Sequence, residues 1–359
     1  MEICDLIIFP DLAKLPKSDL KSICIDMGLD SSKLTFDLAK QIWSEINDDM
    51  EKKGVFIPYY NKLLAGRISV SWFNCDDLKG LSQQIIEKEK YNPFEQKIPF
   101  EESELETKPR LRSASMLTKN TYYLRFIYKD GTRRIVGEDV EILPTSNTAT
   151  AYIDEEQGLI EVRASPDEAQ KIAEVISGYV KQQLSLRKKD FIKPFGYNID
   201  KIAEILEGEL QESKAAPEMW LDTFGVKENE AILEILKALD LYFENNDIDG
   251  LQEKLDDAKA ILGEELLASP FISIILAGLG NVGLKVATKD LRKTVFYQLL
   301  QPYLQPSGGN IRFNVEVGGI EKSFSILIGI ESKSIYFKSN STTEEVIEYV
   351  REKLLGATL

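Results

Sequence analysis

The feature that most constrains the fold is the segment 121–184, in which four strand-like stretches precede one helix. Short stretches rich in β-branched and aromatic residues and bounded by turn residues are typical of strands. The four ranges are 122–128, 132–142, 148–153 and 159–164. The turn signal Asp130-Gly131 separates the first two stretches and predicts a hairpin, and Glu156-Gln157-Gly158 separates the last two.

A helix-start signal follows the fourth stretch. Ser165 is the expected N-cap, Pro166 fills the first helical position, and Glu168 completes a capping box. Apolar residues then recur at helical spacing from Ile172 to Val180. The sequence therefore predicts an antiparallel ββββα module.

A smaller βββα module is expected at the C-terminus. Strands are predicted over 311–317, 324–330 and 334–337, and Thr342-Thr343-Glu344-Glu345 predicts the start of a final helix. The two modules end in a similar strand-cap-helix pattern, which fits either an internal repeat or convergence between common elements.

The remaining segments complete an α+β protein of four parts. Short helices are expected over 11–50, a strand over 67–72, a helix over 77–90 and a linker over 91–109. Residues 198–306 read as almost wholly helical. The predicted parts are an N-terminal mainly helical domain with a helical hairpin (1–107), the ββββα module (108–197), an acidic helical region (198–306) and the βββα module (307–359).

The absence of histidine narrows the functions that the chain can perform. It excludes Ser-His-Asp and Cys-His catalysis and every histidine-liganded metal site. Three cysteines without CxxC spacing argue against a zinc site and a disulfide framework, and favour a reducing, cytoplasmic setting. The apolar runs are too short to span a membrane, and the N-terminus lacks the pattern of a signal peptide. We expect no cofactor and no bound metal.

The net charge of −15 is unevenly distributed. Residues 200–265 contain 6 basic and 19 acidic side chains, a net of −13, whereas residues 108–199 contain 15 and 12, a net of +3. The acidic stretch is expected to form solvated helices, and it could also dock a protein partner. Global acidity does not exclude local binding of nucleic acid.

Residues 15–43, LPKSDLKSICIDMGLDSSKLTFDLAKQIW, resemble the SAP family of helix-extended-helix DNA-binding motifs. The matching features are Leu20-Lys21, Gly28-Leu29 and a second helix from Leu34 to Trp43. In that family, positive side chains at the helix starts contact phosphates, which implies that role here for Lys17, Lys21, Lys33 and Lys40. The chain departs from the family where Gly-x-Lys is usual before the second helix, because it has Ser31-Ser32-Lys33. Six acidic residues between 11 and 45 also oppose a phosphate contact.

A basic cluster with interleaved aromatic residues runs from Lys108 to Arg134. Guanidinium groups that meet phosphates and rings that stack on bases are what a single-strand binding surface needs. The alternative is that Arg125 and Arg133 simply face solvent while the aromatic residues face the core. The candidate contacts in this cluster are Arg110, Arg112, Arg125, Arg133 and Arg134.

Two further patterns have simpler explanations. The run from Gly278 to Gly283 matches GxGxxG, but no acidic residue follows at the required spacing, so we expect these glycines within or between closely packed helices. Asp154, Glu161 and Arg163 resemble a metal-nuclease pattern, and an exposed Glu-Arg pair on a half-buried strand explains them equally well.

These observations favour binding over catalysis. The leading hypothesis is a cytoplasmic protein that contacts DNA or RNA through the N-terminal hairpin and the basic cluster. The alternatives are a protein-protein adaptor that uses residues 200–265, and a metal-dependent nuclease.

Overall fold

The computed structural model describes residues 1–46, 52–76, 78–101, 105–136, 140–180, 186–217, 226–245, 247–262, 282–285, 290–294, 297–298, 301 and 304–356. The chain forms two compact units, which are described separately. The first unit contains Met1–Gly196, Ile205–Glu207 and Arg312–Leu359, and the second contains Tyr197–Glu204 and Gly208–Ile311. Both strand-rich modules therefore belong to the first unit.

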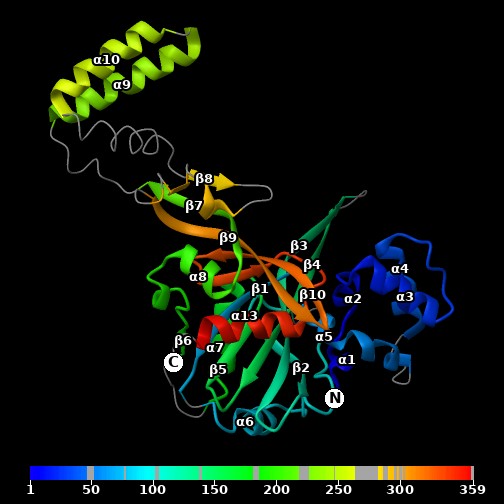
Figure 1. Ribbon diagram of the computed structural model, residues 1–359. Coiled ribbons are helices and arrows are strands. Elements are labelled where there is room, and N and C mark those ends of the chain that lie inside the picture. Colours follow the sequence, from blue (N-terminus) through cyan, green and yellow to red (C-terminus); the bar gives the residue numbers. More distant parts are fainter. Residues whose placement is uncertain are drawn as a thin grey trace. The chain divides into compact units, whose positions relative to one another are not determined.

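An antiparallel sheet forms the centre of the first unit (Figure 1), as the predicted α+β class requires. Its strand order is β2-β3-β4-β5-β1-β11-β10-β9, and the two-residue strand β6 (Arg187–Lys188) also pairs with β1. The strands are β1 (Ile68–Asn74), β2 (Arg110–Met116), β3 (Thr121–Val136), β4 (Val140–Asp154), β5 (Leu159–Arg163), β9 (Leu304–Val317), β10 (Ile320–Gly329) and β11 (Ser334–Phe337).

Strand β1 joins the two predicted modules. Val70 lies opposite Arg163 of β5 on one side and opposite Ile335 of β11 on the other. The segment that the sequence assigned to the N-terminal part is thus the central strand between the ββββα and βββα modules.

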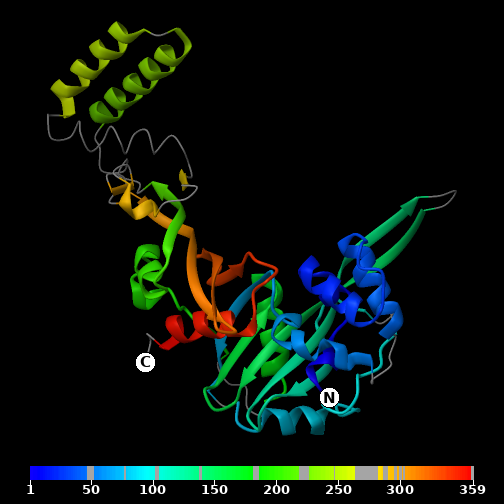
Figure 2. The same ribbon diagram turned by 45° about the vertical axis from the view of Figure 1, so that its right-hand side comes forward.

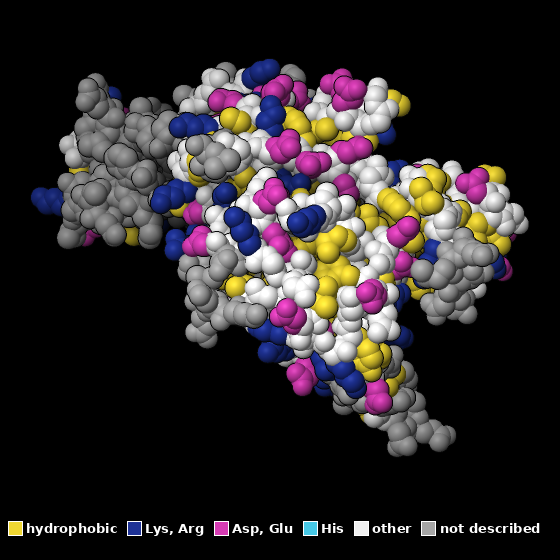
Figure 3. Space-filling view, turned by 90° about the horizontal axis from the view of Figure 1, so that it is seen from below, with side chains coloured by type: hydrophobic (Ala, Val, Ile, Leu, Met, Phe, Trp, Pro, Cys, Tyr) yellow, Lys and Arg dark blue, Asp and Glu magenta, His cyan; other side chains and the backbone are white. Residues whose placement is uncertain are grey.

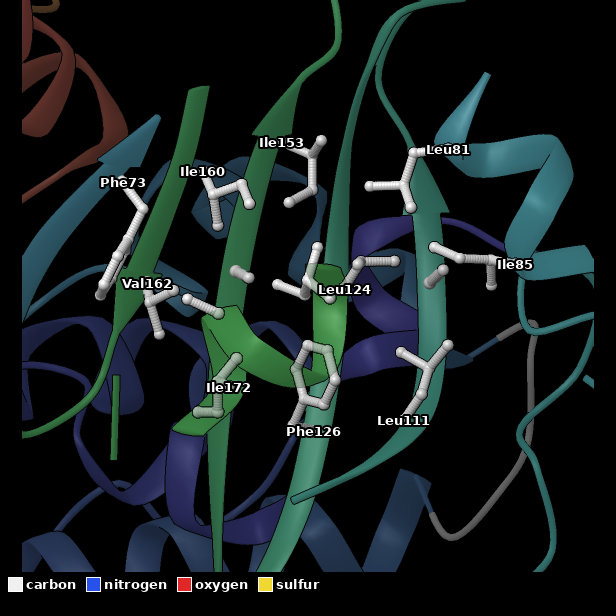
Figure 4. Packing of buried hydrophobic residues seen from close by; sticks show 14 of the residues in the cluster. Phe73, Leu81, Ile85, Leu111, Leu124, Phe126, Ile153, Ile160, Val162 and Ile172 are labelled. Atoms are coloured by element: carbon white, nitrogen blue, oxygen red, sulfur yellow. The ribbon is translucent and has the colours of Figure 1, made fainter. Parts of the chain in front are cut away.

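One face of the sheet carries the main apolar core. Phe73, Leu124, Phe126 and Ile160 pack there against Ile172 of α7 (Figure 4). The helices on this side are α6 (Leu81–Lys88) and α7 (Pro166–Ser177). Helix α7 begins where the sequence predicts, although the Ser165 side chain makes no capping hydrogen bond, so the predicted capping box is wrong.

Short helices at the N-terminus form a second cluster with its own apolar core, which includes Leu20, Ile23, Leu38 and Ile42. Cys24 is buried in it. These helices are α1 (Ile3–Leu6), α2 (Phe9–Ala13), α3 (Lys17–Asp26), α4 (Thr35–Ile46), the 3-10 helix η1 (Lys52–Tyr59) and α5 (Tyr60–Leu63).

The predicted hairpin turn at Asp130-Gly131 is wrong. Strand β3 continues through these residues to Val136, and β4 begins at Val140. Gly131 has a φ of 146° and lies at a register shift next to Lys129, so the glycine accommodates a bulge and not a turn. Beyond the bulge, the paired strands project from the sheet as a two-stranded arm (Figures 1 and 2).

The C-terminal module has the predicted elements. β11 spans the predicted residues, and α13 (Glu344–Gly356) follows Thr342-Thr343. Two other short elements of the first unit are β6 and the 3-10 helix η3 (Lys193–Phe195). The linker expected over 91–109 is in part tied to the sheet, since Ile98 N donates to Arg112 O and Ala114 N donates to Pro93 O.

The second unit is not wholly helical, which corrects the prediction for 198–306. It contains α8 (Ile199–Ile205), β7 (Glu209–Pro217), α9 (Val226–Asn245), α10 (Ile248–Leu262), β8 (Val282–Lys285), the 3-10 helix η5 (Leu291–Lys293) and the first residues of β9.

Strand β7 replaces the helix that was expected to continue from Ile202 to Leu210. Glu207 has a φ of 51°, and Gly208 N donates to Ala203 O, a geometry that ends a helix. Residues 278–281 of the glycine-rich segment lie outside the described residues. Its last two residues, Val282 and Gly283, lie in β8. The expectation of glycines within or between helices is therefore wrong for Gly283.

The opposite face of the first unit's sheet buries charged residues. Glu161 is 0 % exposed and Arg163 is 3 % exposed, so the expected exposed Glu-Arg pair is wrong. The two side chains do share a face, as predicted, but α13 covers that face. Arg163 Nη2 lies 2.9 Å from Glu161 Oε1 and 2.6 Å from Glu344 Oε2, and Arg351 Nη1 lies 3.0 Å from Glu161 Oε2.

Further donors and acceptors complete this ionic network. Trp72 Nε1 donates to Glu161 Oε2 over 2.9 Å, and Arg163 Nη1 donates to Leu64 O over 2.8 Å. Burial alone would raise the pKa of Glu161, but the charges of Arg351 and Arg163 outweigh it and lower that pKa below its usual value. The network therefore holds β5, β1 and α13 together.

We predict that Glu161→Gln lowers the free energy of unfolding by about 3–5 kcal/mol, because it removes the buried carboxylate that Arg163 and Arg351 share. Since the folded-state pKa of Glu161 is lowered, its charge stabilises the fold above the unfolded-state pKa of about 4.3, and that contribution is lost as the pH falls through the folded-state pKa. Urea unfolding at several pH values measures both effects.

The matched control is Glu168→Gln, which breaks a partly exposed ion pair with Lys171 and should cost less than about 1 kcal/mol. Equal losses for the two variants would contradict the role of the network. The Glu161→Gln variant should also lose less stability on acidification than the unsubstituted protein.

Candidate nucleic-acid interface

The segment that resembles SAP motifs folds as two helices joined by a short turn. Gly28 has a φ of 69°, and Leu29 N donates to Cys24 O over 2.7 Å, so α3 ends at the predicted glycine. Where the family has Gly-x-Lys, Asp30 Oδ1 accepts from Ser32 N over 2.9 Å and from its hydroxyl over 2.7 Å. A side-chain turn thus takes the place of the glycine before α4.

The four candidate lysines of this hairpin are all exposed. Lys33 Nζ donates to the amide oxygen of Gln41 over 2.8 Å, and Gln41 carries no charge that would offset the lysine. In the described part of the chain, Lys17, Lys21 and Lys40 have no ion-pair partner. All four charges are therefore available to solvent.

Several of the acidic side chains that oppose phosphate binding have partners within the protein. Asp11 is buried against Arg125, Asp19 lies 2.8 Å from Lys62 Nζ, and Glu45 lies 3.9 Å from Lys52 Nζ. Hydrogen bonds from Ser32 lower the pKa of Asp30, which keeps that carboxylate negatively charged. Pairing with lysines from outside the hairpin therefore offsets the charges of Asp19 and Glu45 only.

Arg125 does not face solvent, and it is not placed to contact nucleic acid. It is 4 % exposed on the sheet face opposite Leu124 and Phe126, and its Nη2 lies 2.7 Å and 2.6 Å from the two carboxylate oxygens of Asp11. Thr148 accepts a further hydrogen bond over 2.8 Å. The pair fastens α2 to the sheet.

Arg110 and Arg112 lie together at the start of β2, where they line a groove of about 630 Å³. Arg112 is half-buried: its guanidinium lies 4.5 Å from the centre of the Phe100 ring, it donates to Ile98 O, and burial lowers its pKa. Lys108 lines both this groove and a neighbouring cavity of about 600 Å³. Arg112 therefore has a structural role, while Arg110 is exposed.

Arg133 and Arg134 are exposed on the arm, past the residues of β3 that pair with β2. In the backbone register they lie opposite Leu143 and Ile142 of β4, respectively, and neither has an ion-pair partner among the described residues. Figure 3 shows basic and acidic side chains interspersed over one face of the molecule, with hydrophobic side chains gathered between them. The candidate cations thus fall into separate groups on the hairpin, the groove and the arm.

The nuclease pattern is not assembled. Glu161 is taken up by the ionic network, and Asp154 Oδ1 accepts from the backbone of Glu156 and Gln157 over 3.0 Å each. Among the described residues, no group of three or more Cys, Asp or Glu side chains is placed to hold a metal ion. No described helix is long and apolar enough to cross a membrane.

Comparison with known proteins adds no relative. No protein-family model matches the chain, and no curated protein sequence matches it. The resemblance to SAP motifs rests on the residues named above and on the two helices α3 and α4 with their short connection.

We predict that Arg125→Met lowers the free energy of unfolding by several kcal/mol, because it leaves the Asp11 carboxylate buried without its counter-charge. It should leave the salt dependence of any nucleic-acid binding unchanged. Asp11→Asn is the matched variant, and a double-mutant cycle measures the coupling. A flatter salt dependence in a stably folded Arg125→Met protein would contradict this assignment.

Proposed function

We propose that this protein is a non-enzymatic binding protein that holds DNA or RNA by its phosphate backbone. The contacts come from Lys17, Lys21, Lys33 and Lys40 on the α3-α4 hairpin and from Arg133 and Arg134 on the β3-β4 arm. The observation that carries the proposal is the charge balance of the hairpin. Its four lysines are exposed, while two of its five acidic side chains, Asp19 and Glu45, lie within 4 Å of lysines from outside the hairpin.

The shape of the arm also supports this proposal. A two-stranded ribbon fits the major groove of duplex DNA, and arginine side chains on such a ribbon reach phosphates on either side. Phosphate contacts position a protein without reading sequence, so we expect binding with little sequence preference. A cytoplasmic location is part of the proposal, because all three cysteines are free and buried.

A second candidate is a protein-protein adaptor, which one observation in the second unit favours. Helices α9 and α10 belong to the acidic stretch, yet they expose large apolar side chains. Leu233, Leu241, Ile248 and Ile261 are 47–58 % exposed. Retention of a protein partner that is lost on Leu233→Ser and Leu241→Ser, without retention of nucleic acid, would favour this candidate.

Replacing Lys17, Lys21 and Lys40 together by Gln should weaken binding to a labelled duplex and flatten the slope of log K against log salt. Each phosphate contact contributes about −0.9 to that slope for duplex DNA, so the expected change is about 2–3. Fluorescence anisotropy titrations at several salt concentrations measure it. The control is Lys79→Gln, Lys119→Gln and Lys338→Gln, three exposed lysines elsewhere in the first unit. Equal effects of the two triple variants would refute a specific role for the hairpin.

The double variant Arg133→Ala and Arg134→Ala tests the arm separately. It should weaken binding to all sequences alike and flatten the salt slope by about 2. Because both side chains are exposed, the melting temperature should stay unchanged. If stability falls instead, and the unsubstituted protein retains no nucleic acid at low salt, these arginines serve an internal contact and the proposal fails.

A further inference from the structure

A polar cavity of about 410 Å³ lies in the first unit where α2, β1, β3, β4 and the start of α7 meet. This volume is within the range of pockets that bind small molecules. The lining includes hydroxyl, amide and charged groups, and it contains none of the hairpin lysines or arm arginines named above. The cavity therefore needs an explanation of its own.

When the ion pairs of the lining residues are taken into account, two basic side chains remain without an acidic partner in the described part of the chain. Asp11 is neutralised by Arg125, Glu168 lies 2.7 Å from Lys171 Nζ, and Arg163 belongs to the buried network. Lys14 and Arg67 are exposed and have no ion-pair partner in the described part of the chain. Asp130 accepts from the Asn147 amide over 3.1 Å and is the remaining acid. The balance favours an anion.

The N-terminus of α7 adds backbone donors to the same cavity. Ala164 and Ser165 line it, and α7 is 12 residues long. Because the Ser165 side chain makes no capping hydrogen bond, the amides of the first turn keep their partial positive charge for another acceptor.

Tyr128 is the observation that points to a ligand. Its side chain lines the cavity and the residue is only 3 % exposed, yet its hydroxyl has no hydrogen-bond partner among the described residues. Burial, with the nearby Glu168 and Asp130 charges, raises the pKa of Tyr128 to about 12, so the hydroxyl stays a donor at neutral pH. Glu168 Oε2, in the same lining, is a buried acceptor without a partner in that part of the chain.

We propose that this cavity binds a phosphate monoester group. Lys14 and Arg67 supply the counter-charge, and Tyr128 and the α7 amides donate to the phosphate oxygens. Glu168 accepts from the protonated oxygen of the monoanion, so the site selects this form although the second pKa of a phosphate monoester is about 6. Sulfate has the same shape but no proton to donate at neutral pH, so the site should discriminate against it. This site and the proposed nucleic-acid surface use different residues, and each can fail without the other.

Isothermal titration calorimetry on the full chain tests the site with four probes: inorganic phosphate, sulfate, adenosine 5′-monophosphate and adenosine. We expect both phosphate compounds to bind, sulfate to bind at least about tenfold more weakly, and adenosine not to bind. A monophosphate that binds more tightly than inorganic phosphate would show that the cavity also receives the nucleoside. Equal affinities would show that the phosphate group alone is held.

Lys14→Gln, Arg67→Gln and Tyr128→Phe should each lower the affinity for phosphate about tenfold, since each removes one charge-assisted contact. Lys79→Gln, an exposed lysine outside the cavity, is the control. Lys14 and Arg67 are exposed, so their variants decide the question even if Tyr128→Phe fails to fold. No heat with either phosphate compound, equal binding of phosphate and sulfate, or binding that none of the three variants alters would overturn the proposal.

Discussion

The first unit depends on the ion pairs that Arg163 makes with Glu161 and Glu344. A charged pair inside a protein is stable only when every member has its counter-charge and its hydrogen bonds, because removing one partner leaves a desolvated charge. Arg163 ends β5, and Glu344, which begins α13, lies 181 positions further along the chain. Arg351 of α13 also pairs with Glu161. The buried charges on the sheet beside β1 therefore have all their partners only when α13 is packed against the sheet. The two modules therefore form one cooperative unit around β1, although each has the sequence pattern of an independent small domain.

Local pattern predicted most elements of this unit, because strand alternation and helix starts depend on neighbouring residues. The strands at 159–163 and 334–337, the start of α7 at Pro166 and the end of α3 at Gly28 all follow from short signals. What covers each face could not be predicted in the same way. Arg125, Glu161 and Arg163 occupy the polar positions of alternating strands, which are usually solvent-exposed. Their partners Asp11, Glu344 and Arg351 are far away in sequence, and nothing local distinguishes such a residue from a surface charge.

Two errors in the predicted secondary structure share a physical origin, which is that glycine occurs in several kinds of backbone conformation. At Gly131, a positive φ accommodates a bulge, and the strand pair continues into an arm. At Gly208 the chain leaves a helix and enters β7, where helical spacing predicted more helix.

The exposure of the candidate cations was partly predictable, because it depends in part on local sequence pattern, as the helices and strands do. Exposure of the hairpin lysines follows from amphipathic helices, whereas the burial of Arg125 depends on α2. Tyr128, Lys14 and Arg67 carried no signal, since only the fold brings them to one cavity.

The acidity of the whole chain is a weak argument against phosphate binding once the structure is considered. At physiological ionic strength, exposed charges farther apart than about 8 Å are largely screened, so the local balance decides the affinity of a surface. Ion pairs inside the protein shift that balance on and beside the hairpin. Asp11 of α2 pairs with Arg125, and Asp19 of α3 pairs with Lys62. In the cavity, the same kind of pairing leaves Lys14 and Arg67 as the uncompensated charges. In both places, some of the acidic residues that oppose an anion in the sequence are paired with cations inside the protein, and the cations that remain unpaired define where an anion can bind.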